Sequence, residues 1–73
     1  SGAERRAAQK ELAAAERRME KVQTLIDALH ERLAAHDQSD YTGLGTLTEE
    51  LRTLETELAS LEERWLELGE LLA

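Results

Sequence analysis

Apolar side chains recur at alternating spacings of three and four residues through nearly all of this chain. This heptad pattern is typical of long helices that pack along a narrow apolar seam. Leu, Glu, Ala, Arg and Lys contribute 47 of the 73 residues, a composition that also favours a coiled coil. The a and d positions are Leu12, Met19, Ile26 and Leu33 with Ala8, Ala15, Val22, Leu29 and His36 in the first block, and Leu44, Leu51, Leu58, Trp65 and Leu72 with Leu47, Leu54, Leu61 and Leu68 in the second.

Residues 37–45 interrupt the pattern with a cluster of Asp, Ser and Gly, which favour turns. Two long helices joined by so short a connection must run antiparallel. The sequence therefore predicts an all-α protein, an antiparallel two-helix coiled-coil hairpin over residues 1–73. Its helices are expected over about residues 3–36 and 46–72. Because the sequence does not open with an initiator Met, we expect the hairpin to be excised from a longer protein.

The start of the second helix is open to two interpretations. Asp40 can cap a helix that begins at Tyr41. Alternatively, Thr46 caps the helix, and Glu49 three residues later completes a capping box. The glycines at positions 43 and 45 each cost up to ~1 kcal/mol inside a helix, which favours the later start. A frayed turn before residue 46 would reconcile the two.

In an antiparallel coiled coil, an a residue of one helix lies level with a d residue of the other. Pairing residues whose numbers add to 80 achieves this along the whole seam. This register places the large Trp65 opposite the small Ala15, so we expect the indole ring in the core. It also brings Arg18 near Arg64, which is an unfavourable contact between like charges.

Several kinds of chemistry have no support in the residues. There is no Cys for a disulfide or a thiolate ligand, and no apolar run near the ~18 residues that span a membrane. A glycine-rich phosphate loop is absent, and carboxylates on an exposed helix lack the cleft that acid–base catalysis needs. Asp27, His30 and Glu31 share a helix face, but a solvated polar surface is a better interpretation than a metal site. We therefore expect no catalytic residue, no metal and no cofactor in this chain, and do not predict an enzyme.

Charge divides the chain into two unlike halves. Residues 1–36 carry a net charge of +1, and residues 37–73 carry one of −8. Four basic residues of the first half lie at heptad positions b, f, f and c, on the face turned away from the seam: Arg6, Lys10, Arg17 and Lys21. Arg side chains can fork onto phosphate oxygens, so this face is a candidate phosphate-binding surface. The alternative is an ordinary solvated stripe that neighbouring Glu residues neutralise.

Five segments form a recognisable set: a basic Ala-rich opening, a Leu-His-Glu-Arg-Leu run, an Asp-Tyr turn, a Leu-Thr-Glu-Glu-Leu run and an ending that contains Glu-Arg-Trp. They occupy residues 3–12, 29–33, 40–41, 47–51 and 61–68. Together they resemble the C-terminal extension of ABC-F proteins, which are soluble ABC ATPases with two nucleotide-binding domains and no membrane domain. Uup-type members carry this extension, and the opening is most similar to that of actinobacterial members.

The resemblance implies a bacterial, cytoplasmic accessory domain that is not itself catalytic. ATP hydrolysis, with ATP and magnesium, would belong to domains outside this chain. ABC-F proteins act largely on ribosomes and translation, and the Uup-type extension is associated with DNA binding. The implied partners are DNA, ribosomal RNA or the ribosome, and the parent ATPase domains. The implied nucleic-acid contacts are Arg5, Arg6, Lys10, Arg17, Arg18 and Lys21.

The overall charge limits the nucleic-acid binding that the resemblance implies. A net charge of −7 argues against strong binding to duplex DNA, and it leaves room for local contact with ribosomal RNA or protein. The alternative function is purely structural, as a coiled coil that dimerises or spaces domains. Leu25, Leu66 and Leu71 lie beside or outside the seam and are available for weak self-association.

Overall fold

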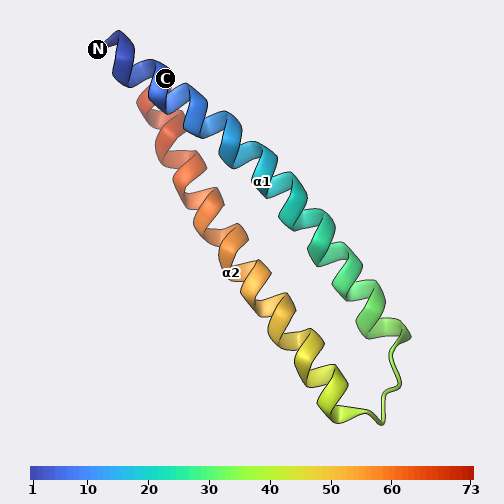
Figure 1. The fold of residues 1–73 in the computed structure, drawn as a ribbon. Helices are drawn as coiled ribbons and strands as arrows, with labels where there is room; N and C mark the ends of the chain where they lie inside the picture. The colour runs from blue at the N-terminus through green and yellow to red at the C-terminus, as the bar shows by residue number, and fades with distance from the viewer.

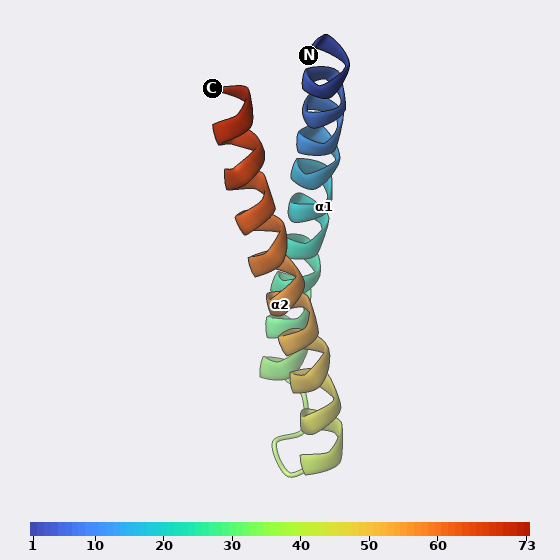
Figure 2. The same cartoon turned by 90° about the vertical axis from the view of Figure 1, so that its left-hand side faces the viewer.

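Two long helices account for almost the whole molecule. The computed structural model describes all residues 1–73 and contains helix α1, Gly2–Ala35, and helix α2, Tyr41–Leu72. The helices lie antiparallel and cross at a shallow angle, with both chain termini at the same end (Figures 1 and 2). The hairpin measures 57 × 15 × 14 Å, so its thickness is that of two helices side by side. The predicted all-α helical hairpin is confirmed.

The apolar core lies in the half of the hairpin nearest the turn. It consists of Val22, Ile26 and Leu29 from α1 and Leu47 and Leu51 from α2. All five occupy predicted a or d positions, where burial of apolar surface drives the packing of amphipathic helices. Two a-position and two d-position leucines pack partly buried against this cluster: Leu33, Leu58, Leu54 and Leu61. Neither helix has an apolar stretch of the length that a bilayer crossing requires.

The first helix begins one residue earlier than predicted, at a capping box. Ser1 Oγ accepts a hydrogen bond from the Glu4 backbone N–H at 3.3 Å, and the Glu4 carboxylate lies 3.5 Å from the terminal amino group. These two reciprocal contacts satisfy backbone donors that a helix N-terminus leaves free. The helix ends at Ala35, and His36 is its extended C-cap residue.

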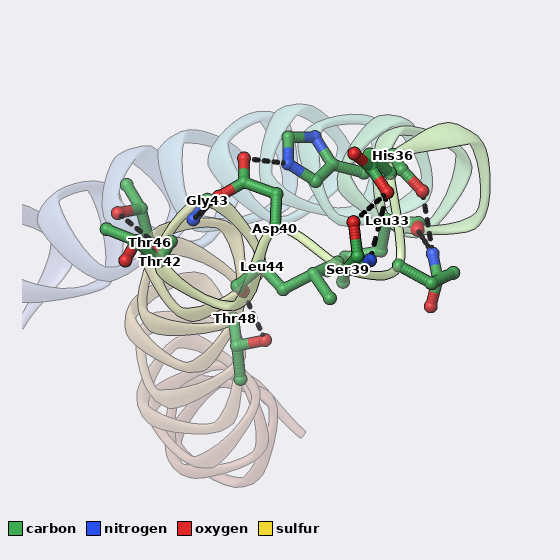
Figure 3. A network of polar contacts seen from close by, with 11 residues as sticks. Leu33, His36, Ser39, Asp40, Thr42, Gly43, Leu44, Thr46 and Thr48 are labelled. Carbon is green, nitrogen blue, oxygen red and sulfur yellow. Dashed lines mark hydrogen bonds and ion pairs between the residues drawn. The ribbon is translucent and has the colours of Figure 1, made fainter.

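The second helix begins at Tyr41, and the predicted start at residue 46 is wrong. Asp40 is its N-cap residue, and one Asp40 carboxylate oxygen accepts a hydrogen bond from Gly43 N–H at 3.1 Å (Figure 3). Thr46 lies inside the helix and donates its hydroxyl to the Thr42 carbonyl at 3.2 Å. The cap at Asp40 satisfies a free backbone donor and supplies negative charge to the positive end of the helix dipole, which outweighs the cost of two helical glycines.

The indole of Trp65 is not a core residue, contrary to the prediction. Its side chain is 38% exposed, whereas Ala15, its predicted partner across the seam, is 7% exposed. Small side chains at this level of α1 do not extend far enough to cover a ring of this size. Gly69 lies one turn further along the same face of α2 and has no side chain to cover it. The sequence position was assigned correctly, but the surroundings leave the ring at the surface.

Candidate nucleic-acid interface

Four basic side chains lie on the outer face of the first three-fifths of α1. Arg6, Lys10, Arg17 and Lys21 are all exposed, and none of them takes part in an ion pair. Over fifteen residue steps of a helix they span roughly 22 Å. Their positions in the heptad turn them away from α2, so a partner can approach them without contact with the acidic second helix. We call these four residues the basic face.

Arg18 is paired with a carboxylate of α2 and does not belong to the basic face. Its guanidinium donates two hydrogen bonds to the Glu57 carboxylate of α2, with Nε–Oε2 and Nη2–Oε1 distances of 2.5 and 2.8 Å. These hydrogen bonds lower the pKa of Glu57 and raise the pKa of Arg18. A bidentate pair of this kind occupies the fork that would otherwise bind phosphate.

Arg5 also has a partner within the chain. Its Nη2 donates a hydrogen bond to the Leu72 carbonyl at 3.1 Å, across the open end of the hairpin. That carbonyl belongs to the last turn of α2, where helix carbonyls have no backbone N–H partner within the helix. The negative end of the helix dipole there also favours a nearby cation. Arg5 thus ties the two ends together. Of the six residues implied by the family resemblance, Arg5 and Arg18 have partners within the hairpin, and the other four have no ion-pair partner there.

The acidic neighbours of the basic face are fewer than the sequence suggested. Glu11 turns to α2, where Arg64 donates to both of its oxygens at 2.6 and 2.9 Å and lowers its pKa. Arg64 also donates to Glu67 at 3.0 Å, so carboxylates offset the charge of both arginines that the register brings near each other. Each of these arginines meets a carboxylate of the facing helix. Glu20 is the one carboxylate at a b, c or f position between residues 6 and 21, so the basic face retains a net positive charge.

The turn between the helices is held by a polar network (Figure 3). The Asp40 carboxylate lies 2.8 Å from His36 Nε2 with one oxygen and caps α2 with the other. Asp37 accepts hydrogen bonds from the backbone N–H and the hydroxyl of Ser39 at 2.9 and 2.7 Å. Gln38 donates to the Leu33 carbonyl at 3.1 Å. The network satisfies groups at the end of α1 and the start of α2, which makes its role structural.

The residues considered as metal ligands do not form a metal site. No group of three or more His, Asp or Glu side chains lies close enough to hold a metal ion. Asp27 accepts a hydrogen bond from the Gln23 side chain at 3.0 Å, four residues earlier on the same helix. This is an ordinary i,i+4 contact of an exposed helix surface.

The charge on Asp40 is expected to make stability depend on pH. The Gly43 N–H and then His36 lower the pKa of Asp40 in the folded state. A lowered folded pKa contributes stability that is present above the unfolded value and is lost as the pH falls through the folded value. Asp40→Asn keeps an oxygen acceptor without the charge. The difference in melting temperature between the natural chain and this variant should therefore narrow between roughly pH 5 and pH 2. A difference that stays constant over this range, measured by circular dichroism, would contradict a role for the charge.

The fold and its surface together define a class of protein: a small helical-hairpin domain whose exposed chemistry is charge on helix surfaces. Comparison with known families agrees with this class. Residues 4–70 match the family described as the ABC transporter C-terminal domain, and the chain belongs to that family. This membership implies a parent ABC domain as a partner. Comparisons with curated proteins and with solved structures give no match.

Proposed function

We propose that this domain is the non-catalytic C-terminal accessory domain of a bacterial, cytoplasmic ABC-F ATP-binding protein of the Uup type. Its role is to contact the phosphate backbone of nucleic acid, either as DNA or as RNA of the ribosome, and so to position the parent ATPase. The observation that carries this proposal is the basic face of α1. It combines four exposed cations that have no internal partner with a single carboxylate among them.

The contacts follow from the chemistry of the four side chains. Arg6 and Arg17 can each donate two parallel hydrogen bonds to phosphate oxygens, and Lys10 and Lys21 act as point charges. Each neutralised phosphate releases condensed counterions, so affinity falls with salt. The basic face lies at outward heptad positions of α1, and the acidic α2, which runs alongside α1 (Figure 2), disfavours approach from its own side. The basic face therefore sets the orientation as well as the attraction.

Binding of a labelled DNA duplex and of a labelled RNA hairpin, followed by fluorescence anisotropy across a salt series, tests this function. Four contacts predict a slope of log affinity against log salt of about −3.6 on duplex DNA. Arg17→Gln should lower the magnitude of this slope by about 1 and weaken binding. Arg52→Gln is the matched control, because Arg52 is also exposed and without an ion pair but lies on α2.

Equal effects of Arg17→Gln and Arg52→Gln would rule out a localised contact on α1. If neither the DNA duplex nor the RNA hairpin bound at low salt, the proposed function of this domain would be rejected. Exposed leucines would then favour the second candidate, a structural coiled coil that self-associates or spaces domains. Leu66 and Leu71 are 59% and 66% exposed near the open end. Sedimentation at increasing concentration detects that self-association directly.

A further inference from the structure

The two flanks of the seam between the helices differ in how their charges are paired. One flank is crossed by three ion pairs, which join Glu11 to Arg64, Arg18 to Glu57 and Arg32 to Glu50. On the opposite flank, at heptad e positions, the charged residues are all acidic and none takes part in an ion pair: Glu16, Glu55 and Glu62. We call this opposite side the open flank. Its carboxylates have no cation within the hairpin to neutralise them.

Two shallow grooves follow one another along the open flank. The first has a volume of about 350 Å³, and its apolar lining includes Ile26 and Leu58. The second, nearer the termini, has a volume of about 380 Å³, and its apolar lining includes Leu12, Trp65 and Leu66. Carboxylates belong to both grooves: Glu55 and Glu62 line the first, and Glu16 and Glu70 line the second. On α2 the linings extend over residues 55–73, which is roughly 27 Å of helix.

The groove beside Trp65 is kept open by Gly69. Nothing within the hairpin requires glycine at this position, because its φ is not positive and an added Cβ would meet no atom within 4 Å. Glycine in a helix interior is less stable than alanine. The chain therefore accepts a weaker helix at the place where a side chain would narrow the groove. The neighbouring Trp65 is 38% exposed, and Trp is one of the residue types enriched among the residues that dominate binding energy.

From these features we infer that the open flank binds a basic amphipathic helix of a protein partner, which lies along the seam as a third helix. The apolar stripe of that helix covers the two grooves, with a large side chain seated beside Trp65 and Gly69. Its flanking Lys or Arg residues meet Glu16 on one side and Glu55 and Glu62 on the other. Helices bind grooves in this manner through an apolar face, and flanking charges select the partner.

A second copy of this chain fits the open flank poorly. The basic face of α1 is the only strongly cationic surface in the hairpin, and the residues between its cations are small, including Ala7, Ala13 and Ala14. It offers no large apolar side chain to fill the groove. Nucleic acid is disfavoured because the open flank carries unpaired negative charge.

The intrinsic fluorescence of Trp65 tests the proposal, because the chain contains one Trp. The probe is a synthetic helical peptide of about 18–20 residues, long enough to cover the grooves, with Leu at a and d and Lys at e and g. We expect a saturable shift of Trp emission to shorter wavelength and protection from acrylamide quenching. The same peptide with Glu in place of Lys should produce neither change.

Two pairs of variants distinguish the open flank from general attraction to an acidic protein. Gly69→Gln should abolish the fluorescence change by filling the groove, whereas Gly45→Gln should leave it intact, because Gly45 also has free space but lies near the turn. Neutralising the open flank with Glu16→Gln, Glu55→Gln and Glu62→Gln should weaken binding about tenfold. The control has the same change in charge at Glu20→Gln, Glu31→Gln and Glu63→Gln, which lie outside both grooves.

Several outcomes would overturn the proposal. One is the absence of any Trp change at saturating Lys peptide. Another is an equal loss of binding in the control variants, which would indicate only non-specific charge attraction. A third is a shift of Trp emission that appears on raising the concentration of the hairpin alone, since the occupant would then be a second copy. Unchanged circular dichroism of Gly69→Gln shows that the fold is intact.

Discussion

Leu29→Ala is expected to lower the free energy of unfolding by about 2–5 kcal/mol, the range for truncation of a buried leucine. Leu29 is 4% exposed and belongs to the core cluster with Val22, Ile26, Leu47 and Leu51. The hairpin has no second layer of structure that could collapse into the space left by the removed methyl groups. A loss of this size is a large part of the roughly 5–15 kcal/mol that stabilises a typical domain. Urea unfolding followed by circular dichroism should show a much lower midpoint with an unchanged slope.

Leu71→Ala is the matched control for this experiment. It removes the same atoms from the same residue type, but its side chain is 66% exposed. A change within about 0.5 kcal/mol is expected for such a surface position. If the two variants lost similar stability, the seam described here would not be the main source of cohesion. A dependence of either midpoint on protein concentration would indicate that self-association contributes to stability.

The heptad pattern predicted the helices and the core because both depend on the same geometric fact. Residues three and four apart lie on one side of a helix, so the apolar side of each helix can be read from spacing alone. Every buried residue of the hairpin, from Ala15 to Leu68, occupies a predicted a or d position. The short polar connection then leaves only the antiparallel arrangement. These conclusions needed no knowledge of side-chain conformation.

The start of α2 could not be predicted in this way because two caps competed. Propensity counts Gly43 as a cost, yet in the structure that glycine is what allows the cap to form. A Cβ at this position would collide with the Asp40 carboxylate and the His36 ring. Asp40 and His36 can be read from the sequence, but how closely their side chains approach the backbone of α2 cannot. Propensity is a weak guide when a local polar network decides a helix end.

The sequence predicted where the basic face lies on α1, but not which arginines belong to it. Heptad positions correctly place Arg6, Lys10, Arg17 and Lys21 on an exposed face of α1. They do not reveal which flanking arginine is taken by a carboxylate of the facing helix. Arg18 pairs with Glu57 and Arg64 with Glu11, and side-chain geometry decides these pairings. The same limit applies to Trp65, whose exposure depends on the small side chains around it.

The two glycines near the start of α2 are expected to respond to alanine in opposite directions. Gly45→Ala should raise the melting temperature, because an added Cβ meets no atom within 4 Å. Alanine is more favourable than glycine in a helix by up to ~1 kcal/mol, which corresponds to roughly 4–8 °C for a domain of this size. Gly43→Ala gains the same propensity but should lower the melting temperature. Its Cβ displaces the Asp40 carboxylate, which then loses both the Gly43 N–H and His36.

The double variant Gly43→Ala with Asp40→Ala separates the cap from the backbone. Once Asp40 has no carboxylate to displace, Gly43→Ala should be nearly neutral or stabilising relative to Asp40→Ala alone. The helix propensity of alanine is then no longer opposed by a clash with that carboxylate. The remaining contact is with the ring of His36, whose side chain can rotate about two bonds. Thermal unfolding of the four proteins in this cycle measures the coupling. Equal and additive effects of the two substitutions would show that Gly43 is not retained for the sake of the Asp40 cap.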